Sequence, residues 1–196
     1  MPHVGVLALQ GDYGAHGRVL SELGVSWRRV KMPQQLDEVD GLIIPGGEST
    51  TLLKLMAPIA MRPALERFYA QGRPLFGTCA GLILLARETR SPVQESLGMI
   101  DIVAERNAYG RQIDSFVGQG EPLVQDLQPA PLKMVFIRAP KIASWQATVT
   151  PLASCRDDVV LARQDNVLVA SFHPELTTDH RVHQYFLDMI AVASSS

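Results

Sequence analysis

The first half of the chain alternates between short apolar runs and segments whose apolar residues recur with helical spacing. Residues 4–9 form a near-continuous apolar run, which is typical of a parallel strand buried on both faces. A helix is expected over 15–23, ending at Gly24, because glycine readily adopts the positive φ that follows a helix end. The remaining expected elements are strands at 26–31, 41–47 and 74–78, and two short helices between 48 and 72 divided by Pro58 and Pro63. This order predicts a doubly wound, mostly parallel sheet with helices on both faces.

The second half is richer in β-structure. Short β-prone segments follow one another, and residues 163–166 fit a hairpin turn between the last two. A final helix is expected over 179–192, where apolar residues recur at helical spacing. The strands expected here are 99–105, 112–117, 133–138, 149–153, 159–163 and 167–172. The expected fold class is therefore α/β with a β-rich second half.

Length and composition indicate one globular domain spanning 1–196. Of the 196 residues, 46% are apolar and 19% are charged, which excludes a disordered chain. A net charge of -2 without a basic block argues against a nucleic-acid partner. The longest apolar stretch, 81–86, is too short to span a membrane, and no signal peptide is recognised. Two cysteines are too few for a disulfide framework, so a cytoplasmic location is expected.

Cys79 lies where the strand 74–78 turns directly into an apolar helix. Gly77 and Gly81 flank it at two residues on each side, which gives a G-x-C-x-G version of the nucleophile elbow. Bulky neighbours would collide with the strand and helix at such a sharp turn. The N–H groups at the start of the helix would favour a thiolate over a thiol. The alternative is a small buried cysteine at a strand end.

A nucleophilic cysteine needs a base, and His173 is the best placed of the five histidines. It follows the strand 167–172, and ligands of doubly wound sheets bind outside the carboxyl ends of strands, where Cys79 also lies. In an extended chain His173 and Glu175 project to the same side, and Pro174 favours that conformation. Glu175 would then orient the imidazole as the third member of a triad. The alternative is a His-Pro turn followed by a solvated glutamate.

The other four histidines are not expected to take part in catalysis. His3 and His16 are predicted to be solvated. His180 and His183 have a spacing that can ligate a metal ion, but no nearby carboxylate or cysteine set completes a site. No metal is therefore predicted.

Residues 45–50, Pro-Gly-Gly-Glu-Ser-Thr, stand at the end of another expected strand. Two glycines before a helix expose backbone N–H groups that can hold a developing oxyanion. A phosphate cradle is the rival interpretation, but the Walker pattern requires a lysine, and none occurs before Lys54. A plain turn is the third possibility.

Together these segments resemble the class I (triad) glutamine amidotransferases, and within them the glutaminase subunits of pyridoxal 5′-phosphate synthase. The elbow around Cys79 and the His-Pro-Glu segment carry the broad resemblance. The motifs that narrow it run in order along the chain at 9–11, 45–51, 105–112, 136–140 and 172–177. The stretch Lys141–Thr150, with Trp145, departs from the family, but it lies away from these motifs.

The resemblance implies an enzyme that hydrolyses L-glutamine to glutamate and ammonia and requires no cofactor. It implies a partner, the synthase subunit, which uses the ammonia to build pyridoxal 5′-phosphate. It places Cys79, His173 and Glu175 in catalysis, the N–H groups of Gly47 and Ala80 in an oxyanion hole, and Gln10 as a sensor of the partner. It places Gly47, Glu48, Ser49, Arg106, Ile137 and Arg138 on the substrate. A guanidinium fork suits the α-carboxylate of glutamine, although Arg106 could instead make an ordinary surface ion pair.

Three other functions are compatible with these residues. The same glutaminase could feed another pathway, such as imidazole glycerol phosphate formation. A cysteine hydrolase or peptidase could act alone on the same sheet. A binding module without activity is the third, and an intact set of Cys79, His173 and Glu175 argues against it.

Overall fold

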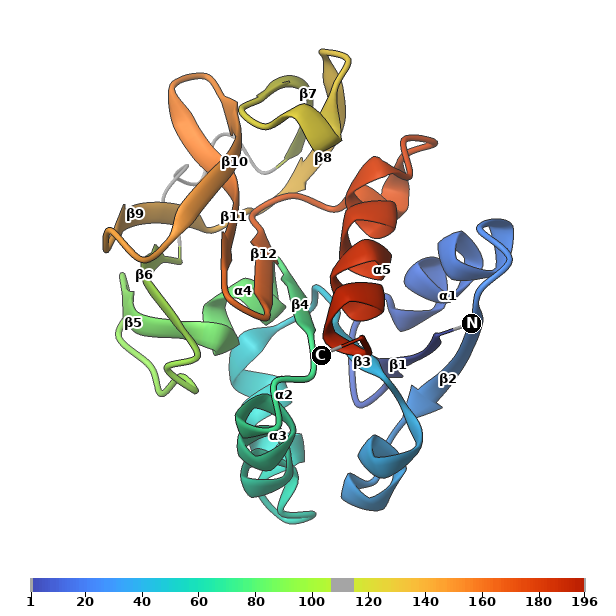
Figure 1. Ribbon diagram of the computed structural model, residues 1–196. Helices are drawn as coiled ribbons and strands as arrows, with labels where there is room; N and C mark the ends of the chain where they lie inside the picture. The colour runs from blue at the N-terminus through green and yellow to red at the C-terminus, as the bar shows by residue number, and fades with distance from the viewer. Residues whose placement is uncertain (1, 107–114, 196) are drawn as a thin grey trace.

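The computed structural model describes residues 2–106 and 115–195. A mixed sheet runs through the molecule with helices on both sides (Figure 1). Its strand order within the described ranges is β2-β1-β3-β4-β12-β11-β10-β7-β8. The first five of these strands are mutually parallel, which confirms the expected parallel half. They are β1 (His3–Leu7), β2 (Ser26–Val30), β3 (Gly41–Ile44), β4 (Leu75–Thr78) and β12 (Val167–Ala170).

The parallel strands are buried on both faces, which explains their continuous apolar runs. Alternate residues of a strand point to opposite faces, so Ile43 belongs to one core cluster, and Leu42 and Ile44 to the other. The first cluster includes residues of α1 (Tyr13–Glu22) and α5 (Arg181–Ala193). The second includes residues of α2 (Ser49–Met56), α3 (Met61–Ala70) and α4 (Ala80–Leu85). Helices therefore cover both faces of the sheet, as predicted.

The second half of the chain extends the sheet with antiparallel strands. These are β11 (Asp158–Gln164), β10 (Thr150–Cys155), β7 (Ser115–Pro122) and β8 (Leu132–Ile137). A separate sheet has the order β5-β6-β9, made of β5 (Ala86–Arg90), β6 (Ile100–Glu105) and β9 (Lys141–Trp145). The three 3₁₀ turns of the described residues are η1 (Pro33–Glu38), η2 (Gln125–Leu127) and η3 (Pro174–Leu176).

Two of the three strands in the smaller sheet were not predicted from the sequence. β5 follows α4 directly, with no glycine or proline between them to mark the change. β9 occupies the start of the stretch that departs from the family, and it pairs with β6. Of the strand expected at 112–117, residues 112–114 lie outside the described residues, and β7 begins at Ser115 and runs longer than expected. In the described ranges, no helix is both long and apolar enough to cross a membrane.

Candidate active site

Cys79 lies between β4 and α4 in a conformation that is rare for residues other than glycine. Its φ is 49° and its ψ is -101°. The backbone is held there because the Cys79 N–H donates to the carbonyl oxygen of Ala170 at 2.8 Å. A residue with such dihedral angles stores about 1–3 kcal/mol of strain, which the surrounding structure must offset. The turn is therefore the sharp elbow that the sequence predicts.

The glycines on both sides of the elbow have no room for a side chain. A Cβ at Gly77 would lie 2.6 Å from the carbonyl carbon of Gly81. A Cβ at Gly81 would lie 2.1 Å from the carbonyl oxygen of Ile44. Real Cβ contacts are not this short, so strand and helix can approach closely only with glycine at both positions. The predicted collision of bulky neighbours is confirmed.

His173 and Glu175 lie together beside this elbow, and both are buried. His173 Nδ1 and Glu175 Oε1 are 2.7 Å apart, which is the expected hydrogen bond. An extended chain does not produce it, because Glu175 lies in the 3₁₀ turn η3 that His173 precedes. The two side chains do meet, but the extended conformation that sequence analysis assumed for residues 173–175 was wrong. The backbone N–H of His173 donates to the Val135 carbonyl at 2.7 Å, which anchors the backbone of His173 to β8.

The environment of the pair favours a charged imidazole and a charged carboxylate. Burial raises the pKa of Glu175, but the imidazoles of His16 and His173 outweigh it and lower that pKa to about 2. Burial lowers the pKa of His173, but hydrogen bonds and charge interactions with Cys79 and Glu175 outweigh it and raise that pKa to about 10. An imidazolium therefore lies beside the sulfur at neutral pH.

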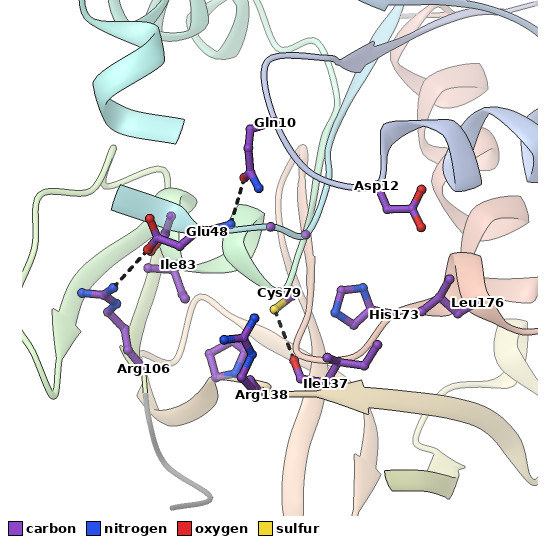
Figure 2. A pocket seen from close by; sticks show the side chains of 14 residues that line it. Gln10, Asp12, Glu48, Cys79, Ile83, Arg106, Ile137, Arg138, His173 and Leu176 are labelled. Carbon is purple, nitrogen blue, oxygen red and sulfur yellow. Dashed lines mark hydrogen bonds and ion pairs between the residues drawn. The ribbon is translucent and has the colours of Figure 1, made fainter. Parts of the chain in front are cut away.

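A cavity of about 370 Å³ opens in front of Cys79 and His173 (Figure 2). It is lined by nearly all the site residues that the sequence predicts; Ala80 and Glu175 are the exceptions, and Glu175 lies behind the imidazole. The lining consists of Gln10, Asp12, Gly46, Gly47, Glu48, Ser49, Cys79, Ile83, Arg106, Ile137, Arg138, Pro140, His173 and Leu176.

The glycine turn at one side of the cavity is held by Gln10 and Glu48. Gln10 Oε1 accepts a hydrogen bond from the Glu48 N–H at 2.9 Å. The Glu48 carboxylate accepts from the N–H groups and hydroxyls of Thr50 and Thr51, which caps α2. These bonds, that of the Thr50 hydroxyl foremost, lower the pKa of Glu48 to about 2. Glu48 is therefore a negative charge at the rim of the cavity at any moderate pH.

Gly46 brings this turn into contact with the catalytic candidates. A Cβ at Gly46 would lie 2.4 Å from His173 Cε1 and 3.3 Å from Cys79 Cβ. Gly47 has a φ of 156°, and a Cβ there would lie 2.4 Å from Gln10 Oε1. Both glycines therefore let backbone approach the site more closely than any other residue could.

The predicted substrate residues are contributed by other elements around the cavity. Arg106 follows β6, and its Nη2 lies 3.8 Å from Glu48 Oε1. This ion pair shows that the two charges are neighbours, while 107–112 of the same motif lie outside the described residues. The Ser49 hydroxyl donates to Gln94 at 2.9 Å. The Ile137 carbonyl faces Cys79 Sγ at 4.0 Å, and Arg138 follows with a φ of 43°.

The prediction that His16 is solvated was wrong. Its side chain is completely buried, with Nε2 at 3.4 Å from Glu175 Oε2 and Nδ1 at 3.0 Å from His183 Nε2. The sequence carries a signal for this burial, because His16 is in register with Val19, Leu20 and Leu23 on one helix face. His180, by contrast, pairs with Glu22 at 3.2 Å. Among the described residues, no group of three or more side chains could hold a metal ion.

Sequence analysis also missed Asp12, Ile83, Pro140 and Leu176 in the cavity wall. Ile83 lies one helical turn after Cys79, so the spacing could have indicated it. Asp12 accepts a hydrogen bond from the Ala15 N–H at 3.2 Å and so caps α1. Pro140 and Leu176 lie within the motifs 136–140 and 172–177, so the resemblance could have indicated them.

Comparison with known proteins gives one consistent result. The sequence pattern of the SNO glutamine amidotransferase family matches residues 6–192. The chain is 51% identical over 187 residues to the pyridoxal 5′-phosphate synthase subunit PdxT of Thermosipho africanus, covering 95% of this chain and 98% of the relative. It is 50% identical over 188 residues to the protein of the same name from Desulforamulus reducens, with 95% and 98% covered. A crystal structure of a glutamine amidotransferase superposes with a TM-score of 0.89 at 43% identity, covering 96% of this chain and 98% of the other.

Proposed function

Because the chain belongs to the SNO glutamine amidotransferase family, we propose that it is the glutaminase subunit of a pyridoxal 5′-phosphate synthase. It hydrolyses L-glutamine to glutamate and ammonia and supplies the ammonia for vitamin B6 synthesis. One observation carries the chemistry: a cysteine on a strained elbow shares a cavity with a histidine that is hydrogen-bonded to a buried carboxylate. The chemistry needs only these side chains, backbone N–H groups and water.

In the first half of the reaction, the Cys79 thiolate attacks the side-chain amide carbon of glutamine. The carbonyl oxygen becomes an oxyanion, which the N–H groups of Gly47 and Ala80 hold; a donor of this kind contributes about 3–4 kcal/mol. His173 carries the proton that the thiol has lost and gives it to the amide nitrogen as the C–N bond breaks. Ammonia leaves, and the γ-carbonyl remains on sulfur as a thioester.

In the second half, water hydrolyses the thioester. His173 takes a proton from the water, and the resulting hydroxide attacks the thioester carbon. The C–S bond breaks, glutamate forms, and the proton returns to the Cys79–His173 pair. Glu175 stays ionised throughout and holds the imidazole in one orientation.

The cavity offers complementary charges to the two ends of the amino-acid group. Arg106 binds the α-carboxylate, and Glu48 lies beside the α-ammonium. The two side chains are already neighbours at 3.8 Å, so glutamine inserts between charges that partly neutralise each other in its absence. Ser49, Gly47, Ile137 and Arg138 complete the substrate contacts.

Free ammonia is mostly ammonium at neutral pH, so its delivery requires a docked synthase subunit. We assign the sensing of docking to Gln10; in support, its side-chain oxygen accepts a hydrogen bond from the Glu48 N–H, in the turn that supplies the Gly47 N–H. We place the complex in the cytoplasm, in keeping with two cysteines that are free and buried.

The test is ammonia release from glutamine, measured with and without the synthase subunit of the same organism. Cys79→Ala should release no ammonia above background, while Cys155→Ala, a buried cysteine on β10, should keep most of the activity. The wild-type rate should rise when the synthase is added. Substantial activity of Cys79→Ala would refute the nucleophile, and equal rates with and without synthase would refute the partner. Turnover of peptides in place of glutamine would favour the stand-alone hydrolase.

A further inference from the structure

A second layer of buried polar side chains lies behind the catalytic candidates, and the mechanism above does not use it. His16 from α1, Thr78 from β4 and His183 from α5 are each 0% exposed. His16 Nε2 lies 3.2 Å from Thr78 Oγ1 and 3.4 Å from Glu175 Oε2, and His16 Nδ1 lies 3.0 Å from His183 Nε2. Buried polar groups are costly unless they are paired, so this cluster requires a reason.

The unpaired atoms of the cluster decide where its protons lie. Within the described part of the chain, His183 Nδ1 and Glu175 Oε2 have no hydrogen-bond partner. A proton on His16 Nδ1 would force the His183 proton onto the unpartnered Nδ1 and turn a bare His16 nitrogen toward a carboxylate oxygen. A proton on His16 Nε2 avoids both penalties, since an unpaired lone pair costs less than an unpaired N–H. His183 Nε2–H then donates to His16 Nδ1, and His16 Nε2–H points between Thr78 and Glu175.

We propose that His16 is a positioning residue for the triad: its Nε2–H, hydrogen-bonded to Thr78 Oγ1, lies 3.4 Å from the second carboxylate oxygen of Glu175 and attracts that oxygen electrostatically without a hydrogen bond of normal geometry. This inference rests on the proposed function. Glu175 Oε1 is engaged by His173 at 2.7 Å, so an N–H dipole facing Oε2 favours one rotation of the carboxylate and hence one plane of the imidazole. Thr78 immediately precedes Cys79, so the same N–H also ties the carboxylate to the strand that carries the nucleophile.

A neutral His16 suits this role better than a charged one. Burial is the main cause that lowers the pKa of His16 below its ordinary value, which favours the uncharged imidazole. Its N–H dipole supports the negative charge of Glu175, whereas a full positive charge would compete with the imidazolium of His173. His16 therefore acts on the carboxylate without removing the carboxylate's effect on His173.

The decisive comparison is between variants that keep or remove the donor. His16→Met fills a similar volume with no N–H, and His16→Gln places an amide N–H near the position of Nε2. Glutaminase assays of the complex with its synthase should show kcat about tenfold lower in His16→Met, with KM within about twofold, because the catalytic groups are present but misoriented. His16→Gln should recover most of kcat. His180→Met is the matched control, since it breaks another contact between α1 and α5, that with Glu22, away from the cavity.

A double-mutant cycle separates positioning from a general loss of structure. The rate at which iodoacetamide alkylates Cys79 in a Cys155→Ala background is the second readout, and it does not require glutamine turnover. His16→Met should slow alkylation severalfold, but it should have no further effect once Glu175 is replaced by Ala. Equal slowing with and without Glu175, or wild-type kcat in His16→Met, would overturn the proposal.

A second variant and the alkylation assay cover the cases in which His16→Met does not fold or the complex has no activity. If His16→Met does not fold, His16→Asn replaces it, because its shorter amide can meet His183 but cannot reach Glu175, and the same losses are expected. If the wild-type complex releases no ammonia, the proposed function fails, while the alkylation rates still decide whether His16 orients the Cys79–His173 pair.

Discussion

At the scale of single residues, Gly46 shows how closely the backbone approaches the catalytic candidates Cys79 and His173. Gly46→Ala places a methyl group 2.4 Å from His173 Cε1, so the imidazole must move. Because a small misplacement of a catalytic group is costly, we expect glutaminase kcat to fall about 100-fold or more. Ammonia release is the measurement. Gly14→Ala in α1 is the control, since its Cβ would have nothing within 4 Å, and it should retain full activity. Near-normal activity of Gly46→Ala would contradict the tight contact.

Arg106 is the residue whose role is most open to a kinetic test. Arg106→Ala should raise KM for glutamine at least about tenfold and change kcat much less, because a carboxylate contact far from the reacting carbon is made equally in the ground and transition states. Steady-state kinetics with synthase present measure both constants. Arg90→Ala, an exposed arginine that pairs with Glu88 on β5, should leave both constants unchanged. An unchanged KM in Arg106→Ala would show that Arg106 does not bind glutamine and makes only internal contacts, such as those with Glu48 and Pro92.

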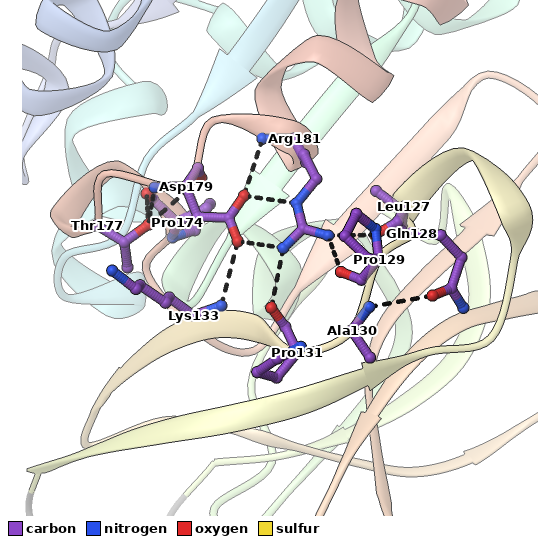
Figure 3. A network of polar contacts seen from close by, with 10 residues as sticks. All are labelled: Leu127, Gln128, Pro129, Ala130, Pro131, Lys133, Pro174, Thr177, Asp179 and Arg181. Atoms are coloured by element: carbon purple, nitrogen blue, oxygen red, sulfur yellow. Dashed lines mark hydrogen bonds and ion pairs between the residues drawn. The ribbon is translucent and has the colours of Figure 1, made fainter.

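At the scale of elements, Arg181 joins the start of α5 to the segment between η2 and β8 (Figure 3). Its guanidinium donates to the carbonyl oxygens of Leu127 and Pro131 at 2.7 and 2.9 Å, and also to that of Pro129. Asp179 holds the guanidinium from the other side, with Nε at 2.9 Å from Oδ1. β8 continues to Ile137 at the cavity, so this cluster fixes one wall of the site to a helix.

The variant Arg181→Met leaves these carbonyls and the Asp179 carboxylate without their shared donor. We expect the free energy of unfolding to fall by about 2 kcal/mol, a value near that of one charged hydrogen bond because the group is partly solvated. Urea unfolding followed by circular dichroism gives the difference. Arg90→Met removes an exposed ion pair with Glu88 and should cost no more than about 0.5 kcal/mol. Equal effects of the two variants would show that the cluster adds no stability.

At the scale of the whole molecule, the buried histidines make stability depend on pH. Burial lowers the pKa of His183 to about 3 from an ordinary 6.5, so between these values the unfolded chain binds a proton that the native state does not. The free energy of unfolding therefore falls as pH drops from 6.5. Glu175, with a pKa of about 2 against 4.5, acts in the same direction below pH 4.5. His173, with a pKa of about 10, stabilises fully below 6.5, and its contribution is lost as pH rises toward 10.

Stability should therefore be greatest near pH 6.5 and decline on both sides. Urea unfolding at pH values from 4 to 9 measures how the free energy of unfolding depends on pH. In His183→Leu, the decline from 6.5 toward 4 should be shallower, because one group that stays unprotonated in the native state has been removed. His3→Leu is the control, since its ring bonds Ser26 at the surface. If wild type and His183→Leu lose the same stability between pH 6.5 and 4, His183 is not the cause of the loss.

The features that the sequence determined by itself are the local ones. Buried parallel strands need continuous apolar runs, so the order of strands and helices in the first half followed from periodicity. The elbow at Cys79 followed from its two glycines, because only glycine permits the close approach of β4 and α4. The motifs shared with the family predicted most residues that line the cavity, from Gln10 to His173.

Outside the motifs, only the tertiary structure decided which distant groups meet. His16 and His183 are 167 positions apart in the chain, and their contact depends on how α1 and α5 pack on one face of the sheet. The turn η3, and not an extended strand, brings Glu175 to His173, and β9 takes its partner from a strand that ends 36 residues earlier, as the register Glu105↔Lys141 shows. The periodicity of apolar residues indicates which side chains are buried, but not which side chains of other elements they contact. Those contacts depend on how helices and strands pack against one another, and the local sequence pattern does not encode this packing.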